Sequence, residues 1–387
     1  MLYNAYSQKL SGSSRSRKDP VSYLNVMVVG STGLGKTAFV RTFCETLKQD
    51  VIQGSYRESK FMVLNEPLRT TRELYTVSMH IQERGQRTAL TLIDTPGFTS
   101  GSAIEHQLKY ISKYIDYQFE RTLAEESKVK RDAKALDTHI HSCLFFIDIK
   151  SINGLSEADR YILKKLSSRV NVVPVIGKSD TLSVAQCEQL KAVFRREVFD
   201  ILQIPVYGYI EVDDEDDNEP FPKLGARSSN RNNILNMLQE CVQEDRDEDA
   251  AAMVEYLDSM PFTLVNYEED LQTGRPINID LPKPSKMTIQ DDLCLGDDIS
   301  DKKKKSNKQS NSGAVLGRAY PWAIVECCNP NHCDFQKLKD ILLTGHRDML
   351  RIDTFERYYE HYRTEQLLKR KLNRTMTIKS KQGMPLV

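Results

Sequence analysis

Short apolar runs alternate with longer stretches of helical periodicity along most of this chain. The runs occupy residues 24–29, 90–93, 143–147, 170–176 and 262–265. Runs of this length suit strands that are buried on both faces, and most of the stretches between them carry apolar residues at helical spacing. The alternation predicts an α/β domain with a mostly parallel sheet flanked by helices.

One pair of runs breaks the parallel pattern. Val77, Met79 and Ile81 alternate with polar residues, and a turn at Arg84-Gly85 leads into residues 90–92. Alternation on both sides of a short turn is typical of two antiparallel strands with one buried face. We therefore expect an antiparallel hairpin at the edge of the sheet.

The pattern divides the chain into a polar and basic segment (1–21), the α/β domain (22–354) and a closing helix with a short tail (355–387). Inside the domain, the acidic run 213–219 and the polar segment 268–313 lack sustained periodicity, so both are predicted loops, the second disordered. Apolar spacing at 338–342 and 355–368 predicts two closing helices. Too little chain follows Leu372 for the heptads of a dimerising coiled coil.

Composition narrows the class of protein. The 387 residues are 40% hydrophobic, and Lys plus Arg equals Asp plus Glu at 54 each, so no overall field favours nucleic acid or an anionic membrane. No run approaches the 18 apolar residues of a membrane span, and the first residues lack the apolar core of a secretion signal. We expect a soluble, cytoplasmic protein whose eight cysteines are small buried hydrophobic residues or free thiols and form no disulfide framework.

A phosphate-binding loop follows the first apolar run. It matches the pattern G-x-x-x-x-G-K-[ST] through Gly30, Ser31, Thr32, Gly33, Leu34, Gly35, Lys36 and Thr37. Between a strand and a helix, such a loop turns backbone N–H groups toward phosphate oxygens at the positive end of the helix. Lys36 and the Thr37 hydroxyl would then reach the terminal phosphates and Mg²⁺. The loop predicts binding of a nucleoside triphosphate.

Two further motifs follow predicted strands. In Asp94-Thr95-Pro96-Gly97, the Asp94 carboxylate can hold Mg²⁺ through water and the Gly97 N–H can sense the terminal phosphate. In Gly177-Lys178-Ser179-Asp180, the Asp180 carboxylate can accept two guanine N–H groups while the Lys178 stem lies along the base. Adenine offers no matching donor pair, which favours GTP. A solvated charge pair at a strand end is the alternative for Lys178 and Asp180.

A cluster near residue 330 has the residue types of a zinc site. Cys327, Cys328, His332 and Cys333 lie within seven residues. Adjacent ligands with so short a gap do not form the usual paired knuckles, and Asn329-Pro330 reads as a turn. We therefore predict no metal there.

Together with later blocks, these motifs resemble the septin family. The later blocks are YIDYQFE at 114–120, GRAYPW at 317–322 and HCDF at 332–335, and the resemblance spans roughly residues 22–363. It implies a P-loop GTPase fold with a C-terminal element found only in septins. It also implies a cytoskeletal GTPase whose subunits join through nucleotide-side and terminus-side interfaces into hetero-oligomeric filaments, at membranes during cell division or differentiation.

The resemblance assigns roles to individual residues. Gly33, Gly35, Lys36 and Thr37 would bind phosphates and Mg²⁺, Lys178 and Asp180 would bind guanine, and Arg318 would pack over the base, as a planar guanidinium can. The alternative for Arg318 is a surface charge beside a core pair formed by Tyr320 and Trp322. Counting back from Asp94 places Thr71 where some septins have the threonine that orders the attacking water, with Thr70 as the neighbouring alternative.

The chain departs from the family pattern at several positions. Thr99-Ser100 replaces Gly-Asp, Ala323 replaces a glycine, and the segment after Tyr267 is much longer than usual. Asn266 stands where a glycine commonly faces the base, although its backbone N–H could still donate. Phe98 stands where fast small GTPases have a water-orienting glutamine, so hydrolysis should be slow or absent.

Two expectations concern partners. Other septin subunits are the expected partners, and the alternative is a regulatory GTPase switch that works without polymerising. Arg15, Arg17 and Lys18 form a short basic segment where septins often carry one, which would add about 1 kcal/mol per charge at an anionic membrane. Lys302 to Lys305 form a second basic segment that could contact an anionic membrane. For each of the two segments, the alternative is a solvated stretch of chain. Membrane association would then occur at the division site or septum.

Overall fold

The computed structural model describes residues 21–59, 71–83, 85–99, 101, 103–130, 136–210, 230–277, 279 and 315–381. Within these residues the chain forms a seven-stranded sheet in the order β2-β3-β4-β1-β5-β6-β7. The strands are β1 (Ser22–Gly30), β2 (Arg57–Glu58), β3 (Tyr75–Glu83), β4 (Gln86–Asp94), β5 (Ser142–Ile147), β6 (Val172–Ile176) and β7 (Phe262–Thr263). Strands β4, β1, β5, β6 and β7 are parallel, which confirms the predicted fold class.

The expected hairpin is present as β3 and β4, which pair antiparallel from Tyr75↔Asp94 to Glu83↔Gln86. It does not form the edge, because the two-residue strand β2 pairs with β3 on the outside. Alternating burial along β3 shows why the periodicity was informative: Val77, Met79 and Ile81 are buried, and the residues between them are more exposed.

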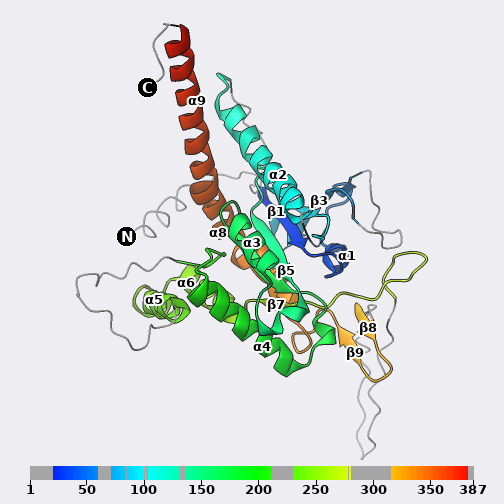
Figure 1. The fold of residues 1–387 in the computed structure, drawn as a ribbon. Helices are drawn as coiled ribbons and strands as arrows, with labels where there is room; N and C mark the ends of the chain where they lie inside the picture. The colour runs from blue at the N-terminus through cyan, green and yellow to red at the C-terminus, as the bar shows by residue number, and fades with distance from the viewer. Residues whose placement is uncertain are drawn as a thin grey trace, which may run out of the picture.

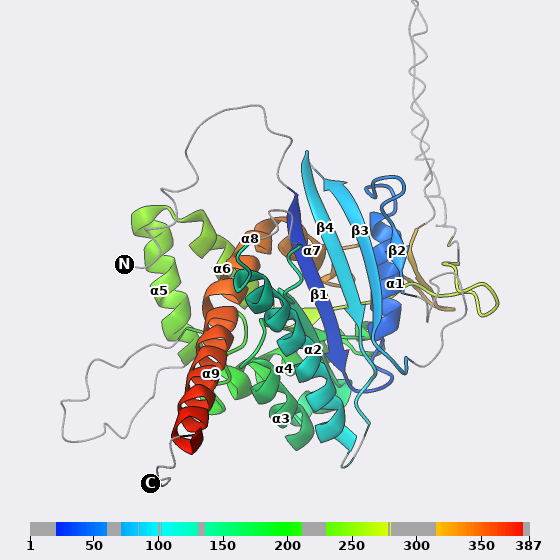
Figure 2. The same cartoon turned by 90° about the horizontal axis from the view of Figure 1, so that it is seen from above.

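Helices cover both faces of the sheet (Figure 1). Those before the last hairpin are α1 (Lys36–Leu47), α2 (Ala103–Glu126), α3 (Glu157–Leu166), α4 (Val184–Arg195), α5 (Asn230–Asp245) and α6 (Glu248–Ser259). Helices α1 and α2 lie on opposite sides of the sheet (Figure 2). On the α1 side, Phe39 and Phe43 pack against Phe335, with ring centroids 5.9 and 6.0 Å apart. This aromatic cluster fixes the helix that follows the phosphate loop.

The C-terminal part contains a small hairpin and a long helical run. Strands β8 (Gly317–Ala319) and β9 (Ile324–Glu326) form a separate two-stranded sheet. Helix α7 (Phe335–Asp340) follows, and α8 (Arg347–Asp353) then continues through a π-helical segment, Thr354–Tyr359, into α9 (Glu360–Lys381). Helix α9 runs alongside α2 and past the end of the sheet (Figure 1). The helix therefore crosses the predicted boundary at 354 and continues beyond Leu372.

The segments predicted as loops are only partly described. Residues 268–277 form a turn in which the Glu268 N–H donates to the carbonyl of Gly317 at 2.8 Å, and Ile279 bridges to Val315. The remainder of 268–313, the acidic run 213–219 and the basic segments at 15–18 and 302–305 lie outside the described residues. In the described part of the chain, no helix has the length and apolarity that crossing a membrane requires.

Candidate functional site

The phosphate loop links β1 to α1 at the carboxyl end of the sheet. Gly33 and Gly35 have φ of 87° and 90°, in the left-handed region that favours glycine, so the loop turns sharply before α1 begins at Lys36. The Lys36 ammonium folds back over the loop and donates to the carbonyls of Gly30 at 2.9 Å and Ser31 at 2.8 Å. Burial lowers the pKa of Lys36 to about 8, although the charge of Asp94 opposes this.

The Asp94-Thr95-Pro96-Gly97 motif and the residue after it are hydrogen-bonded to and packed against this loop. The Thr32 N–H donates to the carbonyl of Phe98 at 3.0 Å, and the Phe98 N–H donates to that of Gly30 at 3.1 Å. A Cβ at Gly97 would lie 2.5 Å from the Thr32 hydroxyl, so only glycine permits this approach. The two motifs therefore form one surface, with Gly97 packed against the phosphate loop, and its contact with a phosphate stays a prediction.

Three oxygen-bearing side chains converge at the start of α1. The hydroxyls of Thr37 and Thr71 donate to Asp94 Oδ2 at 2.6 and 3.1 Å, and the two hydroxyl oxygens lie 3.0 Å apart. Asp94 Oδ1 is buried and has no partner among the described residues. Burial raises the pKa of Asp94, and the two hydroxyls and Lys36 oppose that shift.

This donor set fits Mg²⁺, which prefers hard oxygen ligands and retains several waters. A buried carboxylate oxygen without a hydrogen bond is costly, and a cation beside it would remove that cost. Thr37 and Asp94 are therefore the residues that would hold the ion. Thr71 lies against them, as counting back from Asp94 predicted, whereas Thr70 is outside the described residues.

The motif after β6 packs directly on the phosphate loop. A Cβ at Gly177 would lie 2.3 Å from the carbonyl oxygen of Leu34, so the close contact again requires glycine. Lys178 is exposed and adopts a left-handed conformation at φ 55°. The Ser179 N–H donates to the carbonyl of Leu264 at 3.1 Å, which positions Asp180 at the carboxyl end of the sheet.

The Asp180 carboxylate has two partners on the β8–β9 hairpin. Arg318 donates to Asp180 Oδ2 at 2.9 Å, and the Tyr320 hydroxyl makes a short hydrogen bond to the same oxygen. Burial and then this hydrogen bond raise the pKa of Tyr320, so the hydroxyl stays protonated as a donor. Arg318 thus contacts the carboxylate that should read guanine, and its packing over the base stays a prediction.

Tyr320 is a site residue that the motifs did not reveal. It lies in the GRAYPW block one residue beyond the end of β8, and no spacing in the sequence marked it as a partner of Asp180. The idea that Tyr320 and Trp322 form a core pair was wrong: the rings stack with centroids 5.5 Å apart, but Trp322 is 80% exposed. A hairpin turn that projects from the domain cannot bury a side chain of that size on its own.

Asn266 completes the site on the side of the phosphate loop. Its Nδ2 donates to the carbonyl of Gly35 at 3.3 Å, and its buried Oδ1 has no partner in the described part of the chain. A Cβ at Gly35 would be 3.1 Å from Asn266 Nδ2 and 3.9 Å from the Lys178 side chain. The asparagine is accommodated by bonding to the loop, and it brings the phosphate and base motifs into contact.

The residues around Phe98 bear on hydrolysis. Phe98 is buried, and its ring has no polar group that could orient a water as a glutamine does. Gln107 on α2 accepts from the Thr99 N–H at 3.1 Å and donates to the carbonyl of Gly97 at 3.3 Å. Sequence reasoning missed this glutamine, which braces the loop with its side-chain amide.

The cysteine cluster has an ordinary structural environment. Cys327 and Cys333 are buried, Cys328 is exposed, and His332 Nδ1 accepts from the Glu326 N–H at 2.9 Å. The Cys333 thiol lies 3.1 Å from the carbonyl oxygen of Cys327. The described residues include no group of His, Cys, Asp or Glu side chains arranged to hold a metal.

Comparisons with known proteins agree with this geometry. A family model described as Septin matches residues 22–275 and 300–376. Septin homolog spn3 of Schizosaccharomyces pombe is 29% identical over 347 residues, covering 89% of this chain and 73% of that protein. Neuronal-specific septin-3 of Danio rerio is 29% identical over 343 residues, covering 89% and 74%. The crystal structure of a septin GTPase domain from Chlamydomonas reinhardtii matches the fold with a TM-score of 0.52 at 18% identity, covering 90% of this chain and all of that one. The chain belongs to the septin family.

Proposed function

We propose that this septin binds GTP or GDP with Mg²⁺ and assembles with other septin subunits into hetero-oligomeric filaments of the cytoskeleton. The observation that carries the proposal is the chain of contacts from Asp180 through Tyr320 to the exposed ring of Trp322. It joins the guanine-reading carboxylate to a surface aromatic side chain. A residue of that type at the centre of an interface is a frequent hot spot.

Nucleotide binding follows from the side chains described above. Lys36 would exchange its two carbonyl contacts for β- and γ-phosphate oxygens, and the backbone of Gly33 and Gly35 would cradle the phosphates. Mg²⁺, held by Thr37 and Asp94, would neutralise phosphate charge. The Asp180 carboxylate would accept guanine N–H groups, with Lys178 along the base.

Hydrolysis should be slow. Phe98 has no polar group that could orient a water, and among the described residues Thr71, whose hydroxyl lies beside Asp94 and Thr37, is the candidate for that role. Single-turnover hydrolysis by the protein alone is therefore expected to be slower than about one per minute, as in unassisted GTPases. A rate of several per second would favour the alternative function, a regulatory switch that works without polymerising.

The proposal also includes association of the filaments with membranes at a division site or septum. Arg15, Arg17 and Lys18 are the charges that would contact an anionic surface. A few such charges bind weakly in one subunit, but many copies along a filament bind together by avidity. Binding to anionic vesicles should thus require assembled protein, and equal binding by single subunits would contradict this mode.

The test of assembly compares Trp322→Ala with Tyr161→Ala in protein co-expressed with septin subunits. Tyr161 is a matched control because it is also an exposed aromatic residue, on α3 away from the hairpin. Trp322→Ala should lose retained partners in sedimentation and filaments in electron microscopy, while Tyr161→Ala should keep both. If no septin partner is retained by the parent protein, the filament proposal fails.

A further inference from the structure

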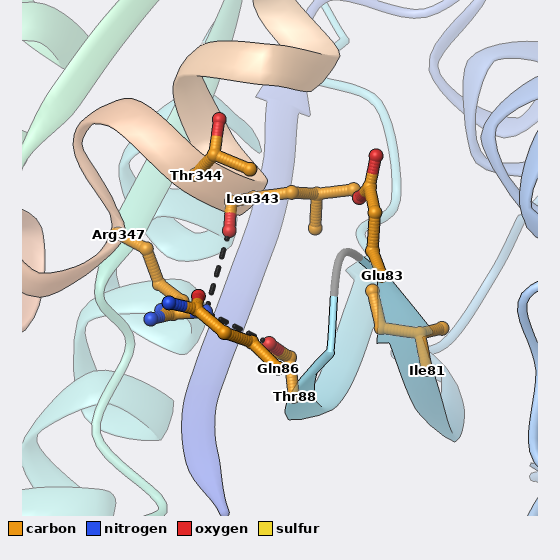
Figure 3. Close-up of a pocket in the computed structure, with 7 residues that line it drawn as sticks. All are labelled: Ile81, Glu83, Gln86, Thr88, Leu343, Thr344 and Arg347. Atoms are coloured by element: carbon orange, nitrogen blue, oxygen red, sulfur yellow. Dashed lines mark hydrogen bonds between the residues drawn. The ribbon is translucent and has the colours of Figure 1, made fainter.

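A polar cavity of about 210 Å³ lies between the β3–β4 hairpin and the start of α8 (Figure 3). It is lined by Ile81, Glu83, Gln86, Thr88, Leu343, Thr344 and Arg347. Strand β1 begins at Ser22, which pairs with Thr88, and ends at Gly30 in the phosphate loop. The cavity is therefore at the opposite end of the sheet from the nucleotide site.

The two charged side chains that line the cavity, Arg347 and Glu83, differ in their hydrogen bonding. Arg347 is buried and donates to the Thr88 hydroxyl at 3.0 Å and to the carbonyl of Leu343, and its Nη2 pairs with Asp348 at 3.3 Å. Glu83 Oε2 is buried and has no hydrogen-bond partner among the described residues. Because Arg347 is directed to Asp348 and Thr88, the carboxylate of Glu83 is left to attract a different cation.

The chain supplies such a cation close by. Thr88, which lines the cavity, is the register partner of Ser22, so residues 1–20 join the domain directly beside it. Residues 15–18 hold Arg15, Arg17 and Lys18, and at roughly 3.3 Å per extended residue they are within reach of Glu83. Charge complementarity and the point of entry of this segment both select it as the occupant.

We propose that a basic side chain of residues 15–18 docks in this cavity and pairs with Glu83. The aliphatic stem of a lysine or arginine would lie on Ile81 and Leu343, and the hydroxyl of Thr344 and the amide of Gln86 would accept its remaining N–H groups. The docked segment would be withheld from an anionic membrane, so docking and membrane contact exclude each other. This inference is independent of filament assembly.

Trypsin provides the test, because it cleaves after Lys and Arg and cannot accept a side chain that is held in the cavity. Cleavage after the docked residue among 15–18 then follows the undocked population. Glu83→Gln should raise the cleavage rate about tenfold, the loss expected for one charge-assisted hydrogen bond. The control is Glu105→Gln, an exposed residue at the start of α2, which should cleave like the parent. Cleavage within 302–305 serves as an internal reference.

Equal rates at 15–18 for Glu83→Gln and the parent would overturn the proposal. Protection that disappears on dilution would also overturn it, since the occupant would then come from a second copy. A second measurement leaves Glu83 intact: deletion of residues 1–20 should increase amide hydrogen exchange in 81–88, and unchanged exchange would contradict docking. Retained nucleotide should be the same in all variants, because none of these residues touches the nucleotide site.

Discussion

The phosphate side of the site, comprising Gly30–Thr37, Asp94 and Gly97, is built mainly from one continuous loop between β1 and α1. The base side, comprising Lys178, Asp180, Asn266, Arg318 and Tyr320, is assembled from three separate segments. Tyr320 lies 140 residues from the carboxylate that it contacts. The first arrangement is determined by local backbone conformation, and the second depends on how distant parts of the chain are packed together.

The two sides also differ in what lies behind them. The phosphate loop is followed by a helix whose Phe39 and Phe43 are buried in the aromatic cluster with Phe335. The partners of Asp180 lie on a two-stranded hairpin that ends in an exposed tryptophan. Phosphate binding should therefore depend little on partners, whereas guanine binding should respond to whatever covers the hairpin.

The largest expected effect comes from the phosphate side. Lys36→Ala removes a buried ammonium that would make charge-assisted hydrogen bonds to the phosphates, so affinity for GDP and GTP should fall roughly 100-fold or more. The measurement is nucleotide released on denaturing purified protein, together with titration. Lys48→Ala, an exposed residue at the end of the same helix, should retain nucleotide. Full nucleotide content in Lys36→Ala would show that the loop is not the phosphate site.

On the base side, Asp180→Asn should replace the preference for GTP with a preference for xanthosine triphosphate. The asparagine amide would present an N–H to guanine N–H groups, and the loss should be a few kcal/mol, or roughly 100-fold in GTP affinity. Xanthosine triphosphate has a carbonyl in place of the guanine amino group and should bind the variant better than GTP. Equal GTP affinities for variant and parent would refute the guanine assignment.

This contrast also explains how far sequence could predict the site. The loop, Thr37 and Asp94 were predictable because their motifs sit at strand ends whose order fixes their positions, whereas Thr71 was placed by the resemblance, through counting back from Asp94. The contact of Tyr320 with Asp180 was not predictable from the sequence. It depends on the pairing of β8 with β9, two short strands that show no hydrophobic periodicity. The core pair of Tyr320 and Trp322 belonged only to the alternative for Arg318, and the hairpin leaves Trp322 exposed although large aromatic side chains are usually well buried.

A third prediction uses the pKa of Lys36. Its value of about 8 in the folded protein is below the ordinary 10.5, so between these values the unfolded chain binds more protons and the stability of the nucleotide-free protein rises with pH. Bound phosphate requires the charged form, so nucleotide affinity should fall by up to about tenfold per pH unit above pH 8. Titration calorimetry in buffers of different ionisation enthalpy should detect proton uptake on binding. Lys36→Ala should lose that uptake.

The smallest expected effect tests whether the hairpin tunes the base side alone. Tyr320→Phe keeps the ring on Trp322 and removes only the hydroxyl that donates to Asp180, and one hydrogen bond of this kind contributes about 0.5–1.5 kcal/mol. GTP affinity should therefore fall roughly threefold to tenfold, while affinity for ATP, which does not use the Asp180 carboxylate, should stay the same. Tyr117→Phe, an exposed tyrosine on α2, is the matched control.

If Tyr320→Phe weakened GTP and ATP binding equally, the hydroxyl would act on the whole domain and the separation between the two sides would be wrong. A loss of GTP affinity alone would show that the hairpin adjusts guanine recognition through Asp180. A partner that covers Trp322 would then change nucleotide affinity through the same contacts, from Trp322 through Tyr320 to Asp180.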